Sequence, residues 1–510
     1  MPSDNSSAAP SVGRHTSADR HLSADRHLVV IGAGITGLAA ARAARQRGVE
    51  VTVLEAGARP GGKLALGTVA DVQVDLGAES ILARRREGTD LVEALGLAGD
   101  MVHPATIAAG IWSRGELRPL PAGQLMGVPG DLQALAETGI LSADGLARAQ
   151  QDPALPPDPI EGDVSVGGFV AARMGREVSD RLVDPLLGGV YAGHADRISL
   201  RAAIPQLAGL AAAGTSLSEG VHELLAAAAA ARPPGPPAPV FAGLRGGVGR
   251  LAVELAAANE ADGVKVRYGT EVRSLTQVSE PGSSAPTTSA EEIRAWRLTM
   301  SDGTDLTADA VLLAVPAFVA ARLLGPIAGL AATDLADIEY ASVAIVTLAV
   351  RRSDLDGTGP NGAGLPGSGF LVPAVDGRAV KASTFSSSKW PWLAESASGL
   401  VLLRASLGRA GESAELDHDD ADLVDVVRAD LADAVGLRAE PVGTHVQRWT
   451  DSLPQYAVGH LDRVARIRAA LPAGTAVAGA AYDGVGIPAC IASARSAVDT
   501  LMNSWNERPN

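Results

Sequence analysis

The sequence predicts an α/β fold in which both ends of the chain contribute to one domain. Residues 27–56 run as an apolar strand, a glycine turn, an alanine-rich helix and a second β-branched strand, the pattern of a βαβ unit. Residues 477–502 repeat the order of strand, glycine loop and helix. Two apolar runs between them, 341–350 and 369–372, are typical of strands in a different sheet. The middle of the chain is therefore predicted to be inserted into the terminal domain.

Hydrophobic periodicity and proline or glycine breaks predict the elements after the first βαβ unit. Helical patterns dominate from residue 90 to residue 210, and a proline-rich break follows at 231–239. Residues 264–278 predict a strand, a turn and another strand. Residues 296–316 predict a hairpin around Asp302-Gly303 followed by a buried strand.

Composition excludes several classes of protein. The 510 residues, 46% of them apolar, can bury a large core. A formal net charge of −15 has the wrong sign for a protein that binds nucleic acid. Cys490 is the only cysteine, which rules out an intramolecular disulfide or a cysteine-rich metal site and fits a reducing cytosol.

The chain shows no segment apolar enough to span a membrane and no secretory signal pattern at its start. We therefore expect a soluble, cytoplasmic protein. Residues 1–26 are polar, carry the near-repeat SADRHL twice and have no hydrophobic periodicity, so we expect a disordered tail.

The glycine turn of the first βαβ unit meets the dinucleotide-binding pattern. Gly32 permits a tight turn after the strand, Gly34 lets the backbone approach a pyrophosphate, and Gly37 allows close packing of helix on strand. Glu55 ends the second strand where a carboxylate would bind ribose hydroxyls, which favours FAD or NAD over NADP. The alternative is an ordinary turn between a strand and a helix, and Glu55 weighs against it.

A second glycine loop favours FAD over NAD as the cofactor. The run ARPGGKL brings Arg59, Gly61, Gly62 and Lys63 directly after the acidic residue, and a nicotinamide enzyme does not need it. Its glycines let the chain pass close under a bound cofactor, and Arg59 is long enough to reach a phosphate. Together with GAGITGL, this run resembles the amine-oxidase-like flavoprotein superfamily.

Five further motifs restrict the resemblance to one group within this superfamily. DLGAESILARR, LPAGQLMGVP, DPLLGGVYAGHADRISL, RWTDSLPQYAVGH and YDGVGIPACI occur in this order and resemble the bacterial protoporphyrinogen and coproporphyrinogen III oxidases of haem synthesis. The similarity runs from His27 nearly to Met502. Two positions depart from the family: His194 stands where an acid is common, and Ala489 stands where an aspartate is common. Both changes leave the glycine geometry intact.

The resemblance implies an α/β architecture with a discontinuous Rossmann-like FAD-binding domain, a mixed-sheet substrate domain and an inserted helical domain. The FAD-binding domain would comprise residues 27–79, 244–320 and 443–510. The substrate domain would comprise 80–90, 181–243 and 321–442. Residues 91–180 would form the helical domain, which corresponds to the membrane-facing part of the family, so peripheral membrane contact stays open.

The resemblance also implies the cofactor contacts. FAD would meet Gly32, Ala33, Gly34, Ile35, Thr36, Gly37, Glu55, Ala56, Gly62, Lys63, Leu76, Gly77, Ala78, Val272, Trp449, Val485, Gly486 and Ile487. Trp449 and the 485–487 loop would lie near the flavin. The loop opens a helix whose positive end favours negative charge on a reduced flavin by about 0.3 to 2 kcal/mol.

The activity implied is oxidation of coproporphyrinogen III to coproporphyrin III, in three two-electron steps. Hydride equivalents would pass to FAD, and molecular oxygen would reoxidise it and yield hydrogen peroxide. The choice of this substrate comes from similarity to Gram-positive-type sequences. Protoporphyrinogen IX oxidase is the nearest alternative, an amine oxidase or carotenoid desaturase lies further away, and a non-catalytic flavin-binding partner that hands tetrapyrrole to a later enzyme belongs to another class.

No catalytic acid or base is named, because hydride transfer needs positioning more than a nucleophile. The sequence contains no Ser/His/Asp series and no clustered metal ligands. Substrate propionates need cations or a solvent-facing rim. Arg84, Arg85 and Arg86 are candidates, with Arg85 preferred, although an ordinary solvated charge run is the alternative.

Other reactive side chains have mainly structural interpretations. His194, His445 and His460 are interpreted as structural or exposed. Tyr191 and Tyr456 either line a flat apolar slot that would hold the porphyrinogen or belong to the core. Cys490, at the start of the last helix, is interpreted as a small buried hydrophobe.

Overall fold

The structure is a computed structural model that describes residues 26–232, 235, 238–278, 295–359, 362 and 364–506. The predicted disordered tail lies outside these residues, apart from Arg26. Within them, parallel and mixed sheets combine with helices, which confirms the α/β class.

A parallel sheet of five strands joins the two ends of the chain. Its order is β12-β2-β1-β16-β22, with every neighbouring pair parallel. The strands are β1 (His27–Ile31), β2 (Glu50–Leu54), β12 (Lys265–Arg267), β16 (Ala310–Leu313) and β22 (Thr475–Val477). Because β1 comes from the start of the chain and β22 from its end, the two ends build this sheet together.

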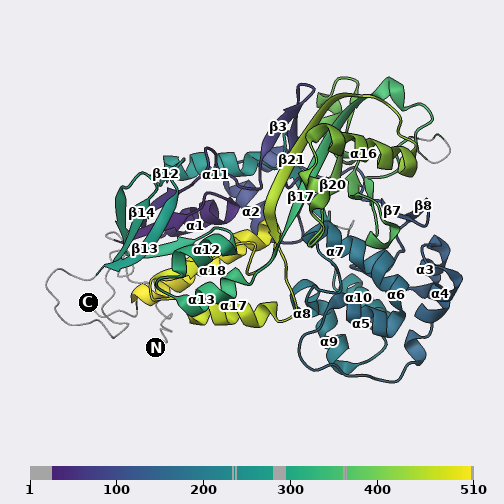
Figure 1. Cartoon of the computed structure of the whole chain (residues 1–510), viewed down its shortest axis with the longest axis horizontal. Helices are drawn as coiled ribbons and strands as arrows, with labels where there is room; N and C mark the ends of the chain where they lie inside the picture. Colours follow the sequence, from purple (N-terminus) through teal and green to yellow (C-terminus); the bar gives the residue numbers. More distant parts are fainter. Residues whose placement is uncertain are drawn as a thin grey trace, which may run out of the picture.

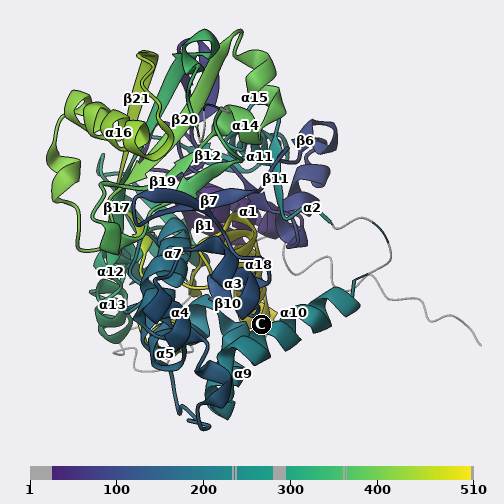
Figure 2. The same cartoon turned by 90° about the vertical axis from the view of Figure 1, so that its right-hand side faces the viewer.

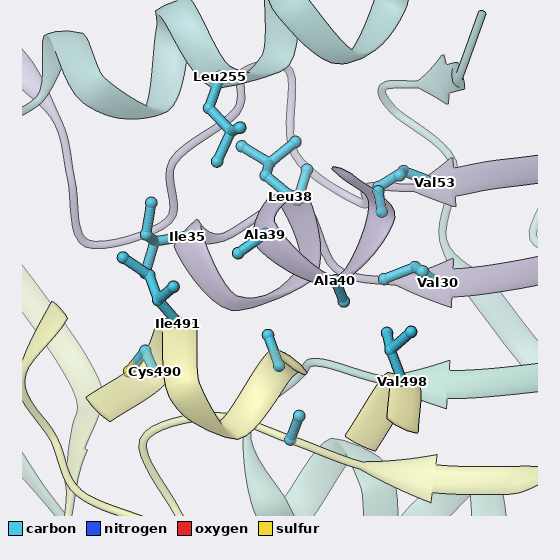
Figure 3. Packing of buried hydrophobic residues seen from close by; sticks show 14 of the residues in the cluster. Val30, Ile35, Leu38, Ala39, Ala40, Val53, Leu255, Cys490, Ile491 and Val498 are labelled. Atoms are coloured by element: carbon cyan, nitrogen blue, oxygen red, sulfur yellow. The ribbon is translucent and has the colours of Figure 1, made fainter. Parts of the chain in front are cut away.

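Three helices cover one face of this sheet (Figure 1). They are α1 (Ile35–Arg45), α11 (Arg250–Ala261) and α18 (Ile487–Asn506). The sequence of α1, ITGLAAARAAR, is rich in alanine, which favours a helix and allows close approach of its neighbours. Figure 3 shows Leu38 of α1 beside Leu255 of α11, and Ile35 beside Ile491 of α18. The first and last helices therefore share one core.

The opposite face packs against a small antiparallel sheet and three further helices. These elements are β13 (Val272–Val278), β14 (Ala295–Met300), β15 (Asp305–Ala308), α12 (Ala317–Leu324), α13 (Gly329–Ala336) and α17 (His460–Ala469). The predicted strand, turn and strand at 264–278 are confirmed as β12 and β13, and the hairpin at 296–316 is confirmed as β14 and β15, followed by β16.

A second sheet of seven strands has the order β21-β17-β20-β19-β18-β7-β8. Its strands are β7 (Ala109–Ser113), β8 (Glu116–Pro119), β17 (Tyr340–Arg351), β18 (Gly369–Leu371), β19 (Val380–Thr384), β20 (Leu400–Leu407) and β21 (Pro441–Pro454). The predicted strands at 341–350 and 369–372 are thus confirmed. Helix α16 (Asp420–Val435) covers one face of the sheet.

The other face of this sheet is covered at its two ends by different groups. Near one end, Ala349 and Leu402 pack against Trp390 and against a hairpin of β3 (Leu66–Val69) and β4 (Val72–Asp75). Near the other end, Ala341 and Val343 pack against Ala192 and Ala410. Two short helices, α14 (Ser386–Lys389) and α15 (Pro391–Ser396), connect β19 to β20.

A helical group lies below the second sheet in Figure 2 and has its own hydrophobic core. It contains α3 (Leu132–Thr138), α4 (Ala143–Ala149), α5 (Val166–Met174), α6 (Arg176–Val178), a π-helical turn (Ser179–Val183), α7 (Asp184–Tyr191), α8 (Leu200–Ala203), α9 (Pro205–Ala213) and α10 (Leu217–Ala230). No helix among the described residues is long and apolar enough to cross a membrane.

Short elements connect these parts. They are β5 (Ile81–Leu82), α2 (Arg86–Ala94), a 3₁₀ turn (Ala98–Asp100), β6 (Met101–Val102), β9 (Gln124–Leu125), β10 (Val128–Pro129) and β11 (Phe241–Leu244). Strand β11 pairs with both β5 and β6.

Helical patterns dominate the sequence from residue 90 to residue 210, but one part of this range forms strands. Residues 101–129 contain β6 to β10, and β7 and β8 form a hairpin that joins the second sheet. The hairpin turns at Arg114 and Gly115, both with positive φ, of 56° and 78°. Such turns favour Asn-Gly or Asp-Gly, so Arg-Gly gave no turn signal in the sequence.

Three segments are placed by partners distant in the sequence. Residues 443–454 belong to β21, which pairs with β17 in the second sheet. Helix α13 packs against α12 and α17 and shares their core on the parallel sheet. The helical group includes α10, which ends at Ala230. In each case the deciding partner lies far away in the sequence, where local periodicity carries no information.

Candidate functional site

The glycine turn after β1 has the geometry that its sequence predicts. Gly32 has a φ of +102°, and a Cβ there would lie 2.6 Å from the Ala314 carbonyl oxygen. A Cβ on Gly37 would lie 1.8 Å from the Gly32 oxygen, so only glycine allows α1 to pack this closely. A Cβ on Gly34, by contrast, would meet no described atom within 4 Å. The space beside Gly34 is therefore open.

The open space lies at the N-terminus of α1. Gly34 is the N-cap of this helix, and within the described chain no side chain caps it. The first N–H groups of a helix need acceptors, and a phosphate is one that they bind well. An uncapped helix end beside a glycine with free space around it thus fits a pyrophosphate.

Glu55 lies across the turn from the same helix. Its Oε2 accepts a hydrogen bond from the Ala33 N–H at 2.7 Å, and its Oε1 accepts one from the Gly57 N–H at 2.7 Å. These bonds orient the carboxylate at the end of β2, and each oxygen keeps a second lone pair for a hydroxyl. The Ala33 N–H thus already has an acceptor, the carboxylate of Glu55.

The start of β13 lies beside Glu55. The Glu55 N–H donates to the Arg267 oxygen at 2.9 Å, and the Thr270 N–H donates to the Glu55 oxygen at 2.8 Å. Val272, two residues further on, is buried and paired with Met300 in the antiparallel sheet. These bonds place the backbone of Val272 in the neighbourhood of the acidic residue.

The second glycine loop is bonded to the first. The Gly61 N–H donates to the Ala33 oxygen at 2.8 Å, and a Cβ on Gly62 would lie 3.5 Å from the Gly34 Cα. Arg59 donates to the carbonyl oxygens of Pro60 and Gly62, both at 3.1 Å. Its guanidinium thus holds this loop in shape.

The turn at Leu76–Ala78 packs on that loop. A Cβ on Gly77 would lie 1.9 Å from the Lys63 oxygen, and the Ala78 N–H donates to the same oxygen at 3.3 Å. From the other side, Trp449 Nε1 donates to the Leu76 oxygen at 3.0 Å. The structure therefore brings together Lys63, the 76–78 turn and Trp449.

The C-terminal loop leads into α18. Gly484 has a φ of +124°, and its N–H donates at 2.7 Å to the hydroxyl of Tyr456. The hydroxyl in turn donates to the Ala480 oxygen at 2.7 Å. Residues Val485 and Gly486 follow, and α18 begins at Ile487. The loop thus presents the N-terminus of the last helix on the same side of the parallel sheet as α1.

Comparison with known proteins agrees with this geometry. The model of the flavin containing amine oxidoreductase family matches residues 35–502. The chain belongs to this family. It is an FAD-dependent oxidase, and the open glycine cradle described above fits its cofactor.

Individual relatives are similar over nearly the full length. The coproporphyrinogen III oxidase of Bacillus subtilis (strain 168) is 33% identical over 484 residues, 93% of this chain and 97% of that protein. The coproporphyrinogen III oxidase of Mycobacterium tuberculosis (strain ATCC 25618 / H37Rv) is 35% identical over 481 residues, with the same coverage. A solved structure from Exiguobacterium sp. 255-15, provisionally named a protoporphyrinogen oxidase, has a TM-score of 0.79 at 32% identity and covers 94% of this chain and 99% of its own.

The three consecutive arginines after the 76–78 turn, Arg84 to Arg86, differ in their partners and exposure. Arg85 is the N-cap of α2 and donates to Glu87 at 2.7 Å, with its side chain 41% exposed. Arg86 pairs with Asp90 and Glu93 along the same helix, as an ordinary solvated charge does. Arg84 is exposed. Helix α2 packs near the start of α18, where a Cβ on Gly88 would lie 3.3 Å from Pro488.

The histidines occupy three different environments. His194 lies 3.0 Å from Glu412 through its Nε2 atom. His445, on β21, has an Nε2 that makes no hydrogen bond among the described residues. His460 is buried and stacks on Tyr456 with ring centroids 3.9 Å apart, and burial lowers its pKa to about 4. These environments are those of structural residues.

Tyr191 and Tyr456 are both buried, with ring centroids 5.4 Å apart. Burial raises the pKa of Tyr191 to about 12, so its phenol stays neutral. Cys490 is buried in the core shared by α1 and α18, and burial raises the pKa of its thiol. The interpretation of Cys490 as a small hydrophobe agrees with this position.

The sequence did not point to three charged residues at the site. Glu79, just after the turn, accepts from Lys389 Nζ at 2.6 Å and from Arg404 Nη1 at 2.8 Å. All three side chains are at most 14% exposed. A signal was present for Arg404, because it interrupts the apolar strand LVLLRASL. Its partners lie too far away in the sequence for that signal to identify them.

Proposed function

We propose that this enzyme oxidises coproporphyrinogen III to coproporphyrin III. The observation that carries this proposal is the near full-length similarity to proteins named coproporphyrinogen III oxidase, at 33% and 35% identity. The cofactor cradle and the uncovered sheet face described next support it.

We infer that the flat macrocycle binds in a slot on the face of the second sheet between its two covered ends. The residues there are paired across neighbouring strands: Ile345 with Ser406, Ser406 with Ala382, and Ala382 with Leu371. All four are half-buried, and none belongs to the two core clusters that cover the ends of this face. Their side chains are small or apolar, as the binding of a flat macrocycle requires.

Helix α7 lies opposite this row. A Cβ on Gly189 would lie 3.5 Å from Leu371 Cδ2, so the helix and the sheet approach closely here. Val190, the next residue, is 40% exposed although it is apolar. An apolar side chain exposed beside an apolar sheet face is suited to the second wall of the slot.

FAD, when bound, supplies the acceptor for the hydride equivalents of the substrate. The residues of the chain bind, orient and exclude water. We infer that FAD is held by the glycine turn 32–37, Glu55 and Ala56, Gly62 and Lys63, the 76–78 turn, Val272, Trp449 and the 485–487 loop. No side chain is proposed as an acid or base.

Substrate propionates require cations, because burying an unpaired carboxylate costs several kcal/mol. We propose Arg85 for one propionate, at the rim near the start of α18. Its partner Glu87 holds the guanidinium in place, and its 41% exposure leaves donors accessible to a ligand. Molecular oxygen is the proposed final acceptor, with hydrogen peroxide as by-product.

We also propose that the enzyme works in the cytoplasm and passes its product to the next enzyme of haem synthesis. A single buried cysteine suits a reducing compartment. Peripheral membrane contact would involve the helical group, and a vesicle flotation assay tests it.

The second candidate is protoporphyrinogen IX, favoured by the provisional name of the Exiguobacterium neighbour. The two substrates differ by two propionates against two vinyl groups, so cations at both ends of the slot would favour the first. Steady-state rates of porphyrin fluorescence in air, measured with each porphyrinogen, decide between them. A higher kcat/KM for coproporphyrinogen III supports the proposal, and a higher value for protoporphyrinogen IX overturns the substrate assignment.

A further inference from the structure

Glu79, Lys389 and Arg404, here called the ion cluster, come from three separate elements. Glu79 follows the 76–78 turn, Lys389 ends α14, and Arg404 lies in β20. Glu79 bridges the two cations, at 2.6 Å from Lys389 and 2.8 Å from Arg404. Burial by itself would raise the pKa of Glu79, but Lys389 and then Arg404 outweigh it and lower the pKa to about 2. The carboxylate is therefore ionised at neutral pH.

Stability does not account for such a cluster. Removing charged groups from water costs several kcal/mol for each ion, and the mutual attraction often only offsets this cost. Replacement of buried ion pairs by well-packed apolar residues is often neutral or stabilising. We therefore looked for a role of the ion cluster in the segments of the chain that its side chains bind.

Arg404 holds the turn that packs on the cofactor loop. While Nη1 binds Glu79, Nη2 donates to the Gly77 oxygen at 2.6 Å. The preceding carbonyl, that of Leu76, accepts from Trp449. Two consecutive carbonyls of the turn are thus fixed by side chains of the second sheet, and the turn is fixed to Lys63 on its other side.

Arg404 also connects the turn to the slot. Alternate residues of a strand share one face, so Arg404 and Ser406 lie on the same face of β20. Ser406 belongs to the half-buried row of the proposed slot. One guanidinium therefore lies between the turn proposed to contact the flavin and the surface proposed to bind the macrocycle.

A small cavity of about 20 Å³ adjoins the cluster. Asp75, Glu79, Arg404, Thr347 and Ser386 are among the residues that line it. Burial raises the pKa of Asp75 to about 6, against hydrogen bonds from the Gly249 and Val248 N–H groups. Above pH 6 the negative charges of Asp75 and Glu79 balance the positive charges of Lys389 and Arg404. The cluster therefore acts through geometry at neutral pH rather than through excess charge.

We propose that the ion cluster positions the flavin. Arg404 fixes the Gly77 carbonyl and with it the 76–78 turn against the isoalloxazine. Glu79 orients Arg404 by accepting from Nη1 while Nη2 binds the Gly77 oxygen, and the planar fork of a guanidinium makes both bonds at once. Lys389 binds the other carboxylate oxygen, Oε1, and so fixes the orientation of Glu79. This inference rests on the proposed placement of FAD at the turn, and the three residues are positioning residues.

The test compares Arg404→Lys and Glu79→Gln with a matched control. Arg173 in the helical group is also buried, donates to Asp152 Oδ1 at 2.9 Å, and donates to the main-chain oxygens of Asp152 at 2.9 Å and Pro156 at 3.0 Å. Arg173→Lys therefore makes the same change to a similar network far from the turn. Each protein is purified with FAD at pH 7.5, and its melting temperature, the visible circular dichroism of the flavin and its midpoint potential are measured.

We expect the two cluster variants to alter the visible circular dichroism of the flavin. We also expect a change of about tenfold in the relative affinity for reduced and oxidised FAD, which is about 30 mV for a two-electron couple. Their kcat should fall more than their KM rises. Arg173→Lys should lower the melting temperature and leave the flavin measurements unchanged.

The proposal is overturned if both cluster variants change only the melting temperature. Glu79→Gln keeps the size of the side chain but removes its charge and one of its two acceptor oxygens, so it serves if Arg404→Lys does not fold. The potential is measured with dithionite and without porphyrinogen. If the variants shift it while wild-type protein oxidises no coproporphyrinogen III, the positioning role stands and the proposed function fails.

Discussion

Trp449 Nε1 donates to the Leu76 carbonyl oxygen at 3.0 Å, across 373 positions of sequence. Trp449 belongs to β21 of the second sheet, whereas Leu76 follows β4 near the start of the chain. The bond therefore connects the sheet proposed to bind substrate to the turn proposed to bind cofactor.

Replacing Trp449 with Phe should weaken FAD binding about threefold to tenfold, because a hydrogen bond contributes roughly 0.5 to 1.5 kcal/mol. Trp112→Phe is the control, since Trp112 lies in the core on the α16 side of the same sheet. Fluorescence titration of deflavinated protein with FAD measures both. Equal affinities for the two variants would remove Trp449 from the site.

Gly34→Val should fold and fail to retain FAD. No described atom lies within 4 Å of the position of its Cβ, so the side chain would fill only the space proposed for the pyrophosphate. Gly209→Val is the control, because it lies on α9 with the same freedom around it. The flavin-to-protein absorbance ratio of each purified protein gives the occupancy. Full occupancy in a folded Gly34→Val protein would contradict the cradle.

Arg85→Ala should raise the KM for coproporphyrinogen III more than it lowers kcat, since an anchored propionate contributes to binding in the ground state and the transition state alike. The expected rise is about tenfold, which corresponds to about 1.4 kcal/mol for a charge-assisted hydrogen bond. Arg86→Ala, which removes the ion pairs with Asp90 and Glu93, should leave KM unchanged. An unchanged KM in Arg85→Ala would exclude this residue from the substrate site.

The stability of the fold should fall between pH 6.5 and pH 4 because of His460. Burial lowers the pKa of this histidine from 6.5 to about 4, so over this range the unfolded state binds more protons than the folded state. The stabilising contribution is complete above pH 6.5 and is lost as pH falls towards the folded pKa. The loss amounts to about 3 kcal/mol at most.

His460→Phe keeps the stacking on Tyr456 and removes the titration. Urea unfolding of both proteins at several pH values isolates the contribution of His460, because all other groups titrate in both. The difference in free energy of unfolding should change across this range. A difference independent of pH would show that His460 is not buried in its neutral form.

The sequence predicted the parts of the site that depend on local patterns. Gly32, Gly34 and Gly37 form the expected turn because their spacing is set by one strand and one helix, and Glu55 follows from the strand after it. Resemblance to the family added Leu76 and Trp449 as separate contacts. It did not indicate that they bond to each other.

Long-range pairing explains what the sequence missed. Glu79 meets Lys389 and Arg404 only because three distant elements converge, and no periodicity records this. The place of residues 443–454 in the second sheet has the same cause, because β21 is placed by its pairing with β17. Patterns within a segment identify its structure, and contacts between segments decide to which domain it belongs.

Anaerobic titration with coproporphyrinogen III tests the central claim most directly. The purified holoenzyme should lose its yellow flavin absorbance as substrate is added under argon, and admission of air should restore the colour while porphyrin fluorescence appears. A flavin that stays oxidised in the presence of excess coproporphyrinogen III would contradict the account.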